Sequence, residues 1–193
     1  MNKKVVEIPT LKIDVAEFQI TGTAPLIVHQ FGAKSIKMIA DKQAKKSKER
    51  EARNPEEEMK SCLYPFADGK RTGFPAVGFK SSMIRAGKSL EYTMKDLQSL
   101  FFVVPDESDL IEIVGTPTLR TDMVRVGMGS ADIRYRPEYK TWSAKITIRY
   151  NSSAISAEQL AQLLMAAGFG CGVGEWRPEK SKTGSYGTWA ISE

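Results

Sequence analysis

The sequence predicts an α+β protein whose core follows the β-α-β-β-α-β order of the ferredoxin-like fold, with a charged helical arm and a β-hairpin inserted into that core. Apolar and polar residues alternate strictly over residues 142–150, which predicts a strand with one apolar face. Apolar residues at helical spacing predict two helices, from about Phe79 to Tyr92 and from Ala157 to Ala167. Apolar runs before, between and after these segments supply the remaining strands.

Composition sets the class of protein. The length of 193 residues suits a single domain spanning residues 1–193, and 41% apolar with 26% charged residues allows a buried core in a protein that stays in solution. The net charge of +5 favours nucleic acid or another acidic partner. No N-terminal signal segment and no apolar run of membrane-spanning length is expected. Cys62 and Cys171 are expected to be free thiols, so we expect a cytoplasmic protein that contacts no membrane.

The first expected strand changes its alternation partway along. Leu11, Ile13 and Val15 alternate with polar residues. Phe18 and Ile20 follow the opposite parity. This slip predicts a bulge or a break between two strand pieces.

Residues 33–60 differ in kind from the rest of the chain. Helix-forming residues dominate, apolar residues are sparse after Ile39, and lysines and arginines fill the first two thirds. Three glutamates follow Pro55. One interpretation is a charged helix exposed to solvent, and the other is a basic arm that contacts phosphates.

The next stretch predicts a turn, an extended piece and the first helix. Asp68-Gly69 is typical of a turn between two strands. Residues 74–78 are expected to be extended, because a residue before proline avoids the α region, and the helix is expected to start near Phe79. The positive end of the helix dipole favours a phosphate site at this start, and the alternative is an ordinary amphipathic core helix. The candidate side chains are Lys80, Ser81, Ser82 and Arg85.

A short helix from Lys95 to Leu100 is expected to lead into two buried strands. These are Phe101–Val104 and Leu110–Val114, and the polar stretch between them predicts a hairpin. Further along, Ser156 is predicted to cap the second helix, with Gln159 in the capping-box position.

The segment 120–150 predicts a basic β-hairpin. On the strand 142–150, the apolar residues share one parity, and the other parity carries Lys145 and Arg149. Cations are mixed with aromatic and methionine residues before this strand, as in proteins that bind single strands through phosphates and stacked bases. A solvated hairpin is the alternative. The interleaved residues are Arg120, Met123, Arg125, Met128, Arg134, Tyr135, Arg136, Tyr139 and Lys140.

A glycine-rich loop follows the second helix, which Gly168 is expected to end. Glycine occupies every second position through Gly170, Gly172 and Gly174. Aromatic and basic residues lie beside these glycines, which predicts backbone laid against a polyanion; a flexible connection is the alternative. The neighbouring residues are Trp176, Arg177, Lys180 and Lys182.

His29 is the single histidine, and it is interpreted as a structural residue or as a candidate for acid–base catalysis. No carboxylate, cysteine or histidine spacing matches a metal-ligand set, and no Gly-Lys-Ser/Thr sequence ends the glycine-rich loop. We therefore expect neither a metal nor a cofactor.

Two segments resemble motifs of the RAMP superfamily, the repeat-associated proteins of CRISPR systems. Residues 73–85, GFPAVGFKSSMIR, resemble the family's extended turn into its first helix. Residues 168–174 and 184–188 resemble the glycine-rich loop before its last strand. The resemblance implies an RRM-like core and a subunit that holds single-stranded RNA, polymerises along it and reaches its neighbours through an inserted arm. The chain also looks similar to small phage-encoded proteins outside CRISPR operons, which adds single-stranded DNA as a ligand and the bacterial host cytoplasm as a location.

These observations lead to three hypotheses. The first is a non-catalytic protein that binds single-stranded RNA or DNA and self-assembles along it as a homo-oligomer or filament. The second is a metal-independent endoribonuclease of the same superfamily that uses His29. The third is a phage factor that mimics a CRISPR subunit and binds other phage or CRISPR-type proteins. The predicted nucleic-acid-binding residues are Lys80, Ser81, Ser82, Arg85, Arg125, Arg134, Tyr135, Arg136, Lys145, Arg149, Gly170, Gly172, Gly174, Trp176, Arg177 and Lys182.

Overall fold

The computed structural model describes residues 10–30, 53–126 and 130–192. The expected charged arm lies mostly outside these residues. Its described end forms a short helix, α2 (Pro55–Ser61), which Asn54 caps by accepting hydrogen bonds from the backbone N–H groups of Glu56 and Glu57.

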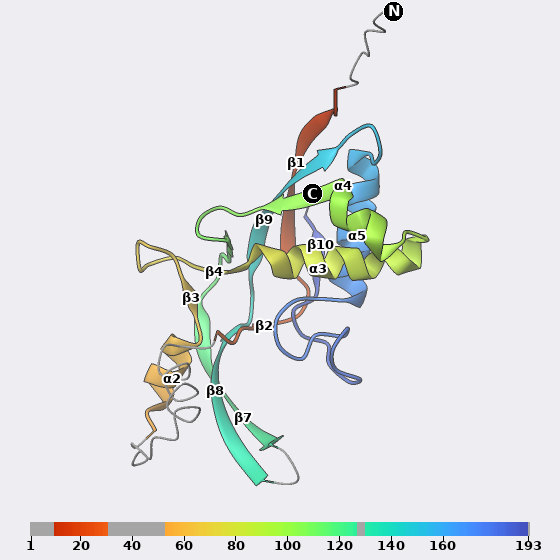
Figure 1. Cartoon of the computed structure of the whole chain (residues 1–193). Helices are drawn as coiled ribbons and strands as arrows, with labels where there is room; N and C mark the ends of the chain where they lie inside the picture. The colour runs from red at the N-terminus through yellow and green to blue at the C-terminus, as the bar shows by residue number, and fades with distance from the viewer. Residues whose placement is uncertain (1–9, 31–52, 127–129, 193) are drawn as a thin grey trace, which may run out of the picture.

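The centre of the structure is a four-stranded antiparallel sheet, which together with the helices gives the α+β class that the sequence predicts (Figure 1). Two helices, α3 (Ala76–Ala86) and α5 (Ala157–Gly170), lie on the same side of this sheet and pack against each other. Their buried residues join those of the sheet in one core. The strands occur in the spatial order β10 (Trp189–Ile191), β1 (Ile13–Gly22), β9 (Ser143–Asn151) and β5 (Phe101–Val104).

Strand β9 confirms the predicted alternation. Ala144, Ile146 and Ile148 are fully buried against the helices, whereas Lys145 and Arg149 are exposed on the outer face. Covering one face of a sheet with helices is what makes a period of two visible in the sequence.

The bulge predicted in the first strand is wrong. Strand β1 pairs with β9 in one unbroken register, from Ile13 opposite Asn151 to Thr21 opposite Ser143. The parity slip has another cause: Ile13 and Val15 are exposed on the outer face, while Ile20 is buried on the inner face.

Both long helices differ from prediction at one end. Helix α3 starts at Ala76, directly after Pro75, so residues 76–78 are helical rather than extended; its last turn continues as a 3₁₀ helix, η1 (Gly87–Leu90). Helix α5 begins with the predicted capping box but runs past Gly168 to Gly170. A side chain at Gly168 would place its Cβ 2.3 Å from the carbonyl oxygen of Trp189, so this glycine allows a close helix–strand approach.

The hairpin predicted after helix α4 (Met94–Leu100) is wrong. Strand β5 pairs with β9, whereas β6 (Leu110–Glu112) pairs with β4 (Thr72–Pro75) in a second, small sheet. Strand β3 (Tyr64–Pro65) completes that sheet across the predicted turn, where the Asp68 carboxylate accepts hydrogen bonds from two backbone N–H groups.

The predicted basic hairpin is present in the structure, but it ends at Tyr139 and does not include β9. Strands β7 (Pro117–Val126) and β8 (Ser130–Tyr139) pair with each other and extend away from the four-stranded sheet, whereas β9 stays within that sheet (Figure 1). Strand β2 (Leu26–Ile27) pairs with β8, and α2 lies beside the hairpin. None of the described helices is both long and apolar enough to cross a membrane.

Candidate nucleic-acid interface

One face of the β7–β8 hairpin carries a buried ion cluster. Arg120 and Arg136 lie opposite each other across the two strands. Arg136 is only 1% exposed; its two terminal nitrogens donate to Asp122, at 2.6 Å, and to Glu175 of the glycine-rich loop, at 3.2 Å. Arg120 donates from Nε to Asp122, at 2.9 Å, and from Nη1 to Glu138, at 2.6 Å. Burial acts to lower the pKa of Arg120, but these hydrogen bonds raise it above its ordinary value.

The same two guanidinium groups hold Trp176 of the loop. The Arg136 and Arg120 groups lie 4.8 and 5.2 Å from the centre of the indole ring, within the range of cation–π attraction. Trp176 also contacts the Tyr186 ring at a centroid distance of 5.9 Å. The cluster therefore fastens the hairpin to the glycine-rich loop.

Three predicted ligand contacts are corrected by these positions. Arg136 is unavailable to a phosphate, because it is buried and its two terminal nitrogens are ion-paired. Tyr139, a predicted stacking residue, is fully buried, and its hydroxyl lies 2.7 Å from that of Thr72. Ser82 is buried and donates to the backbone oxygen of Ala167.

The chain's own backbone explains most of the loop glycines. Gly174 and Gly187 have positive φ angles of 77° and 66°, and side chains there would place a Cβ 2.4 and 1.8 Å from the carbonyl oxygens of Ile27 and Val173. Gly172 also has a positive φ, whereas Gly170 lies in α5 with open space beside it. No external ligand is needed to account for these residues. A hollow of about 330 Å³ lies beside the loop and is lined by Gly174, Glu175, Trp176, Arg177, Lys180 and Ser181.

Acidic partners engage three of the other predicted cations. Arg85 of α3 forms an ion pair with Glu179 at 2.7 Å, and Arg177 donates to the same carboxylate at 3.2 Å. Lys145 donates to Glu17 at 3.2 Å across the exposed face of the sheet.

The structure brings Lys80 and Arg149 together around Phe102, a residue that the sequence prediction missed. Phe102 lies on β5 between buried Phe101 and Val103, so its ring points outward and is 46% exposed. The Lys80 ammonium lies 4.0 Å from the ring centroid and donates to the backbone oxygen of Gln98; the Arg149 guanidinium lies 5.8 Å from the ring. Burial lowers the pKa of Lys80.

Other predicted residues lie on different elements. Ser81 is exposed on α3, and Lys182 is exposed in the loop. Arg125 and Arg134 lie on the β7–β8 hairpin. The Tyr135 ring lies under the guanidinium of Arg53, 5.4 Å away.

His29 follows β2 and is partly buried. Its backbone oxygen lies 3.5 Å from the Tyr64 hydroxyl, which donates to it. Burial lowers the pKa of His29, and the positive charges of Arg136 and Arg134 act in the same direction, while Glu175 acts against them. A lowered pKa favours the neutral ring, which is the form in which a general base accepts a proton. Within the described ranges, no three His, Cys, Asp or Glu side chains are grouped so that they could hold a metal ion.

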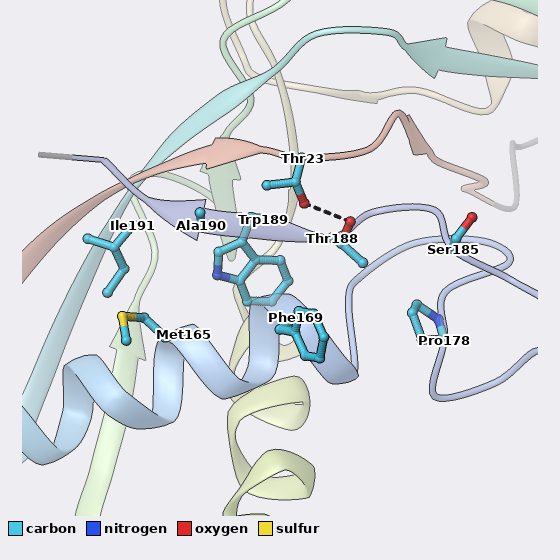
Figure 2. Close-up of a pocket in the computed structure, with 9 residues that line it drawn as sticks. All are labelled: Thr23, Met165, Phe169, Pro178, Ser185, Thr188, Trp189, Ala190 and Ile191. Carbon is cyan, nitrogen blue, oxygen red and sulfur yellow. Dashed lines mark hydrogen bonds between the residues drawn. The ribbon is translucent and has the colours of Figure 1, made fainter.

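A second hollow, of about 560 Å³, lies between α5 and β10 (Figure 2). Phe169 lines this hollow and is 87% exposed. Thr23 and Thr188 also line the hollow, and the Thr23 hydroxyl donates a hydrogen bond to the Thr188 hydroxyl. The remaining lining is largely apolar and includes Met165, Trp189 and Ile191.

No protein-family model matches this chain, and no curated protein matches its sequence. Among solved structures, the chain is similar to the crystal structure of Cmr6 from Pyrococcus furiosus. The superposition has a TM-score of 0.47 and 9% sequence identity, and it covers 94% of this chain and 98% of that chain.

Proposed function

We propose that this protein is a non-catalytic binder of single-stranded nucleic acid and that Phe102 on the outer face of the four-stranded sheet is the centre of its interface. The observation that carries the proposal is an exposed aromatic ring with two cations beside it, Lys80 and Arg149, which come from different elements. Single-strand binders use this combination, because bases stack on aromatic rings while phosphates pair with nearby cations.

A single strand fits this site better than a duplex. Stacking on Phe102 needs an unpaired base with a free face, which paired bases in a helix do not offer. Lys145, on the same strand as Arg149, adds a second cation along the outer face. Neither contact distinguishes ribose from deoxyribose, so RNA and DNA both remain ligands of the proposal.

The topology is compatible with this use of the sheet. In chain order the core elements are β1, α3, β5, β9, α5 and β10, and the spatial strand order is β10-β1-β9-β5. This arrangement supports the ferredoxin-like assignment, in which the helices cover one face and leave the other open. Membership of the RAMP superfamily stays a prediction.

The test is the affinity for a 20-nucleotide single strand of RNA and of DNA, measured by fluorescence anisotropy over a series of salt concentrations. Phe102→Ala is expected to weaken binding by about 1–3 kcal/mol, or roughly 5- to 150-fold. Arg149→Gln is expected to reduce the slope of log affinity against log salt by about 0.7, as one phosphate contact is lost.

Phe169→Ala is the matched control, because Phe169 is an exposed aromatic residue on α5 rather than on β5. It is expected to bind like the unaltered protein. Equal affinities for the Phe102 and Phe169 variants would place the interface elsewhere. Absence of binding to both strands at low salt would refute the nucleic-acid function itself.

His29 supports a second proposal, a metal-independent endoribonuclease, since its lowered pKa keeps the ring neutral and able to accept a proton. If the proposal is right, the unaltered protein cleaves single-stranded RNA in the presence of a chelator, and His29→Ala binds the RNA without cleaving it. RNA that stays intact with the unaltered protein would rule this activity out.

A further inference from the structure

The first half of β1 has a free edge. Strand β10 and its flanking hydrogen bonds cover β1 from Gln19 to Thr23, while β9 pairs along the whole of the other side. From Ile13 to Phe18, no strand within residues 10–30, 53–126 and 130–192 pairs with the β10 side. A free edge presents backbone N–H and C=O groups that can pair with another chain.

The register shows which residues face this edge. Gly22 donates its N–H to Trp142, and Lys12 accepts from Ser152, so the even-numbered residues of β1 bond to β9. The odd-numbered Gln19 bonds to Ser192, on the β10 side. Because backbone groups alternate in direction along a strand, Ile13, Val15 and the preceding Leu11 direct their N–H and C=O groups to the free edge.

Apolar side chains gather at this edge. Leu11, Ile13 and Val15 are 67%, 47% and 60% exposed, and all three share the parity of the outer face. Lys12 and Asp14 are also exposed and have the opposite parity. Sheet proteins usually protect a free edge with an inward-pointing charge, a proline or a bulge. Lys12 and Asp14 are such inward-pointing charges, but residues 11–18 contain no proline or bulge, no described strand pairs with them on the free side, and their outer face presents alternating apolar side chains.

We propose that this edge pairs antiparallel with the same edge of a second copy of the chain, in a register centred on Ile13. In that register the two Ile13 residues lie opposite each other, and each Leu11 lies opposite the Val15 of the other copy. On the other face, each Lys12 lies opposite the Asp14 of the other copy. The segment is thus complementary to itself in both apolar contacts and charge.

Neighbouring registers lack this complementarity. Centring the pairing on Lys12 or on Asp14 sets two like charges directly opposite each other, which destabilises a sheet. Centring it on Val15 sets Ile13 opposite Glu17. Centring the pairing between two residues places odd-numbered residues of one copy, whose backbone groups face the edge, opposite even-numbered residues of the other copy, whose backbone groups face β9. The ladder of hydrogen bonds then cannot form.

The pairing joins identical surfaces, so it closes after two copies and gives a symmetric dimer instead of a filament. The two four-stranded sheets merge into one continuous sheet. Val15 is the cross-strand neighbour of Arg149 in the proposed binding site, but the pairing uses the backbone edge of β1 and the dimer forms without nucleic acid. It therefore stands or fails independently of the proposed function.

The test is the molar mass of the full chain without nucleic acid, measured by sedimentation over a range of concentrations. Lys12→Asp or Asp14→Lys creates two like-charge pairs across the dimer axis, and each is expected to weaken association about tenfold or more. The double variant K12D/D14K restores both opposite-charge pairs and is expected to associate like the unaltered protein. Lys70→Asp, an equal charge change in an exposed turn, is the control and is expected to leave association unchanged.

Crosslinking gives a second measurement. Ile13→Cys places two thiols across the axis with their Cα atoms about 5.5 Å apart, within disulfide range, so oxidation is expected to yield a covalent dimer. Met123→Cys, at an exposed site on the hairpin, is the control and is expected to remain monomeric; the native Cys62 and Cys171 are buried. A monomer mass for the unaltered protein at every concentration, a double variant as weak as the single ones, or no Ile13→Cys crosslink would overturn the proposal.

Discussion

Replacing Arg136 with methionine tests whether this arginine holds the hairpin to the glycine-rich loop. Methionine keeps an unbranched apolar side chain in the buried position but removes the charge and the hydrogen bonds. The substitution removes the nitrogen that lies 2.6 Å from the Asp122 carboxylate and the nitrogen that lies 3.2 Å from the Glu175 carboxylate. It also removes one of the two guanidinium groups that contact Trp176.

The expected loss comes from the carboxylates left behind. Breaking a buried ion pair by removing one partner costs about 3–5 kcal/mol. Asp122 is 7% exposed but keeps its bond to Arg120 at 2.9 Å, and Glu175 is 38% exposed and can be hydrated. Both facts place the expected loss in the free energy of unfolding at the lower end, about 3 kcal/mol. Total stabilities are about 5–15 kcal/mol, so this is a large fraction.

The assay is equilibrium unfolding in urea, with Arg134→Met as the control on the same strand. Arg134 is partly exposed and no ion pair within the described residues involves it, so its replacement is expected to change stability by no more than about 0.5 kcal/mol. Equal stability of the two variants would refute the structural role of Arg136. A fall in the salt slope of nucleic-acid binding, with stability unchanged, would restore Arg136 as a phosphate contact.

Three further outcomes are expected. Gly187→Ala is expected to prevent folding or to destabilise the folded protein strongly, because its Cβ would lie 1.8 Å from a carbonyl oxygen at a φ of 66°. Gly170→Ala lies in a helix with open space beside it and is expected to stabilise the folded protein by about 0.5–1 kcal/mol. Thermal melting measures both effects. NMR titration is expected to give a pKa of about 2 for Asp68, because the neighbouring Arg71 guanidinium lowers it from the ordinary value of 3.8. The stability that the ionised Asp68 contributes is therefore expected to be lost as the pH falls from 3.8 towards 2. Asp68→Asn is expected to remove this pH dependence. Because the pKa of His29 is lower in the folded protein than in the unfolded chain, the unfolded chain takes up the proton at a higher pH. Stability is therefore expected to decline as the pH falls below 6.5, and to decline less in His29→Gln.

Local pattern predicts the elements of this fold better than their partners. The alternation in β9 and the capping box of α5 concern residues that are neighbours in sequence, and both are confirmed. The pairing of β5 with β9 joins Phe101 to Tyr150, far apart in the chain, and no local signal in the apolar run specifies it. The hairpin prediction failed for that reason.

The candidate site shows the same limit for charged and aromatic residues. Arg136 and Arg134 look alike in the sequence, yet Arg136 is buried and pairs with Glu175, which is 39 positions away. Phe102 was hidden in an apolar run, although its alternation with buried Phe101 and Val103 is a signal of one outward side chain. Burial of a charge depends on long-range partners, whereas the outward position of Phe102 was available from alternation once the strand was assigned.

The two proposals bear on each other through the outer face of the sheet. In β9, Arg149 lies between Val15 of β1 and Phe102 of β5 in the paired register, so the proposed binding site and the proposed dimer edge occupy the same face. In the merged sheet the two Phe102 strands are five strand spacings apart, or about 24 Å measured across the strands. A nucleic-acid strand long enough to reach both rings binds the second as an intramolecular step, at a raised effective concentration, whereas a shorter strand contacts one ring alone. Dimerisation would thus make affinity depend on the length of the strand without any added contact per nucleotide.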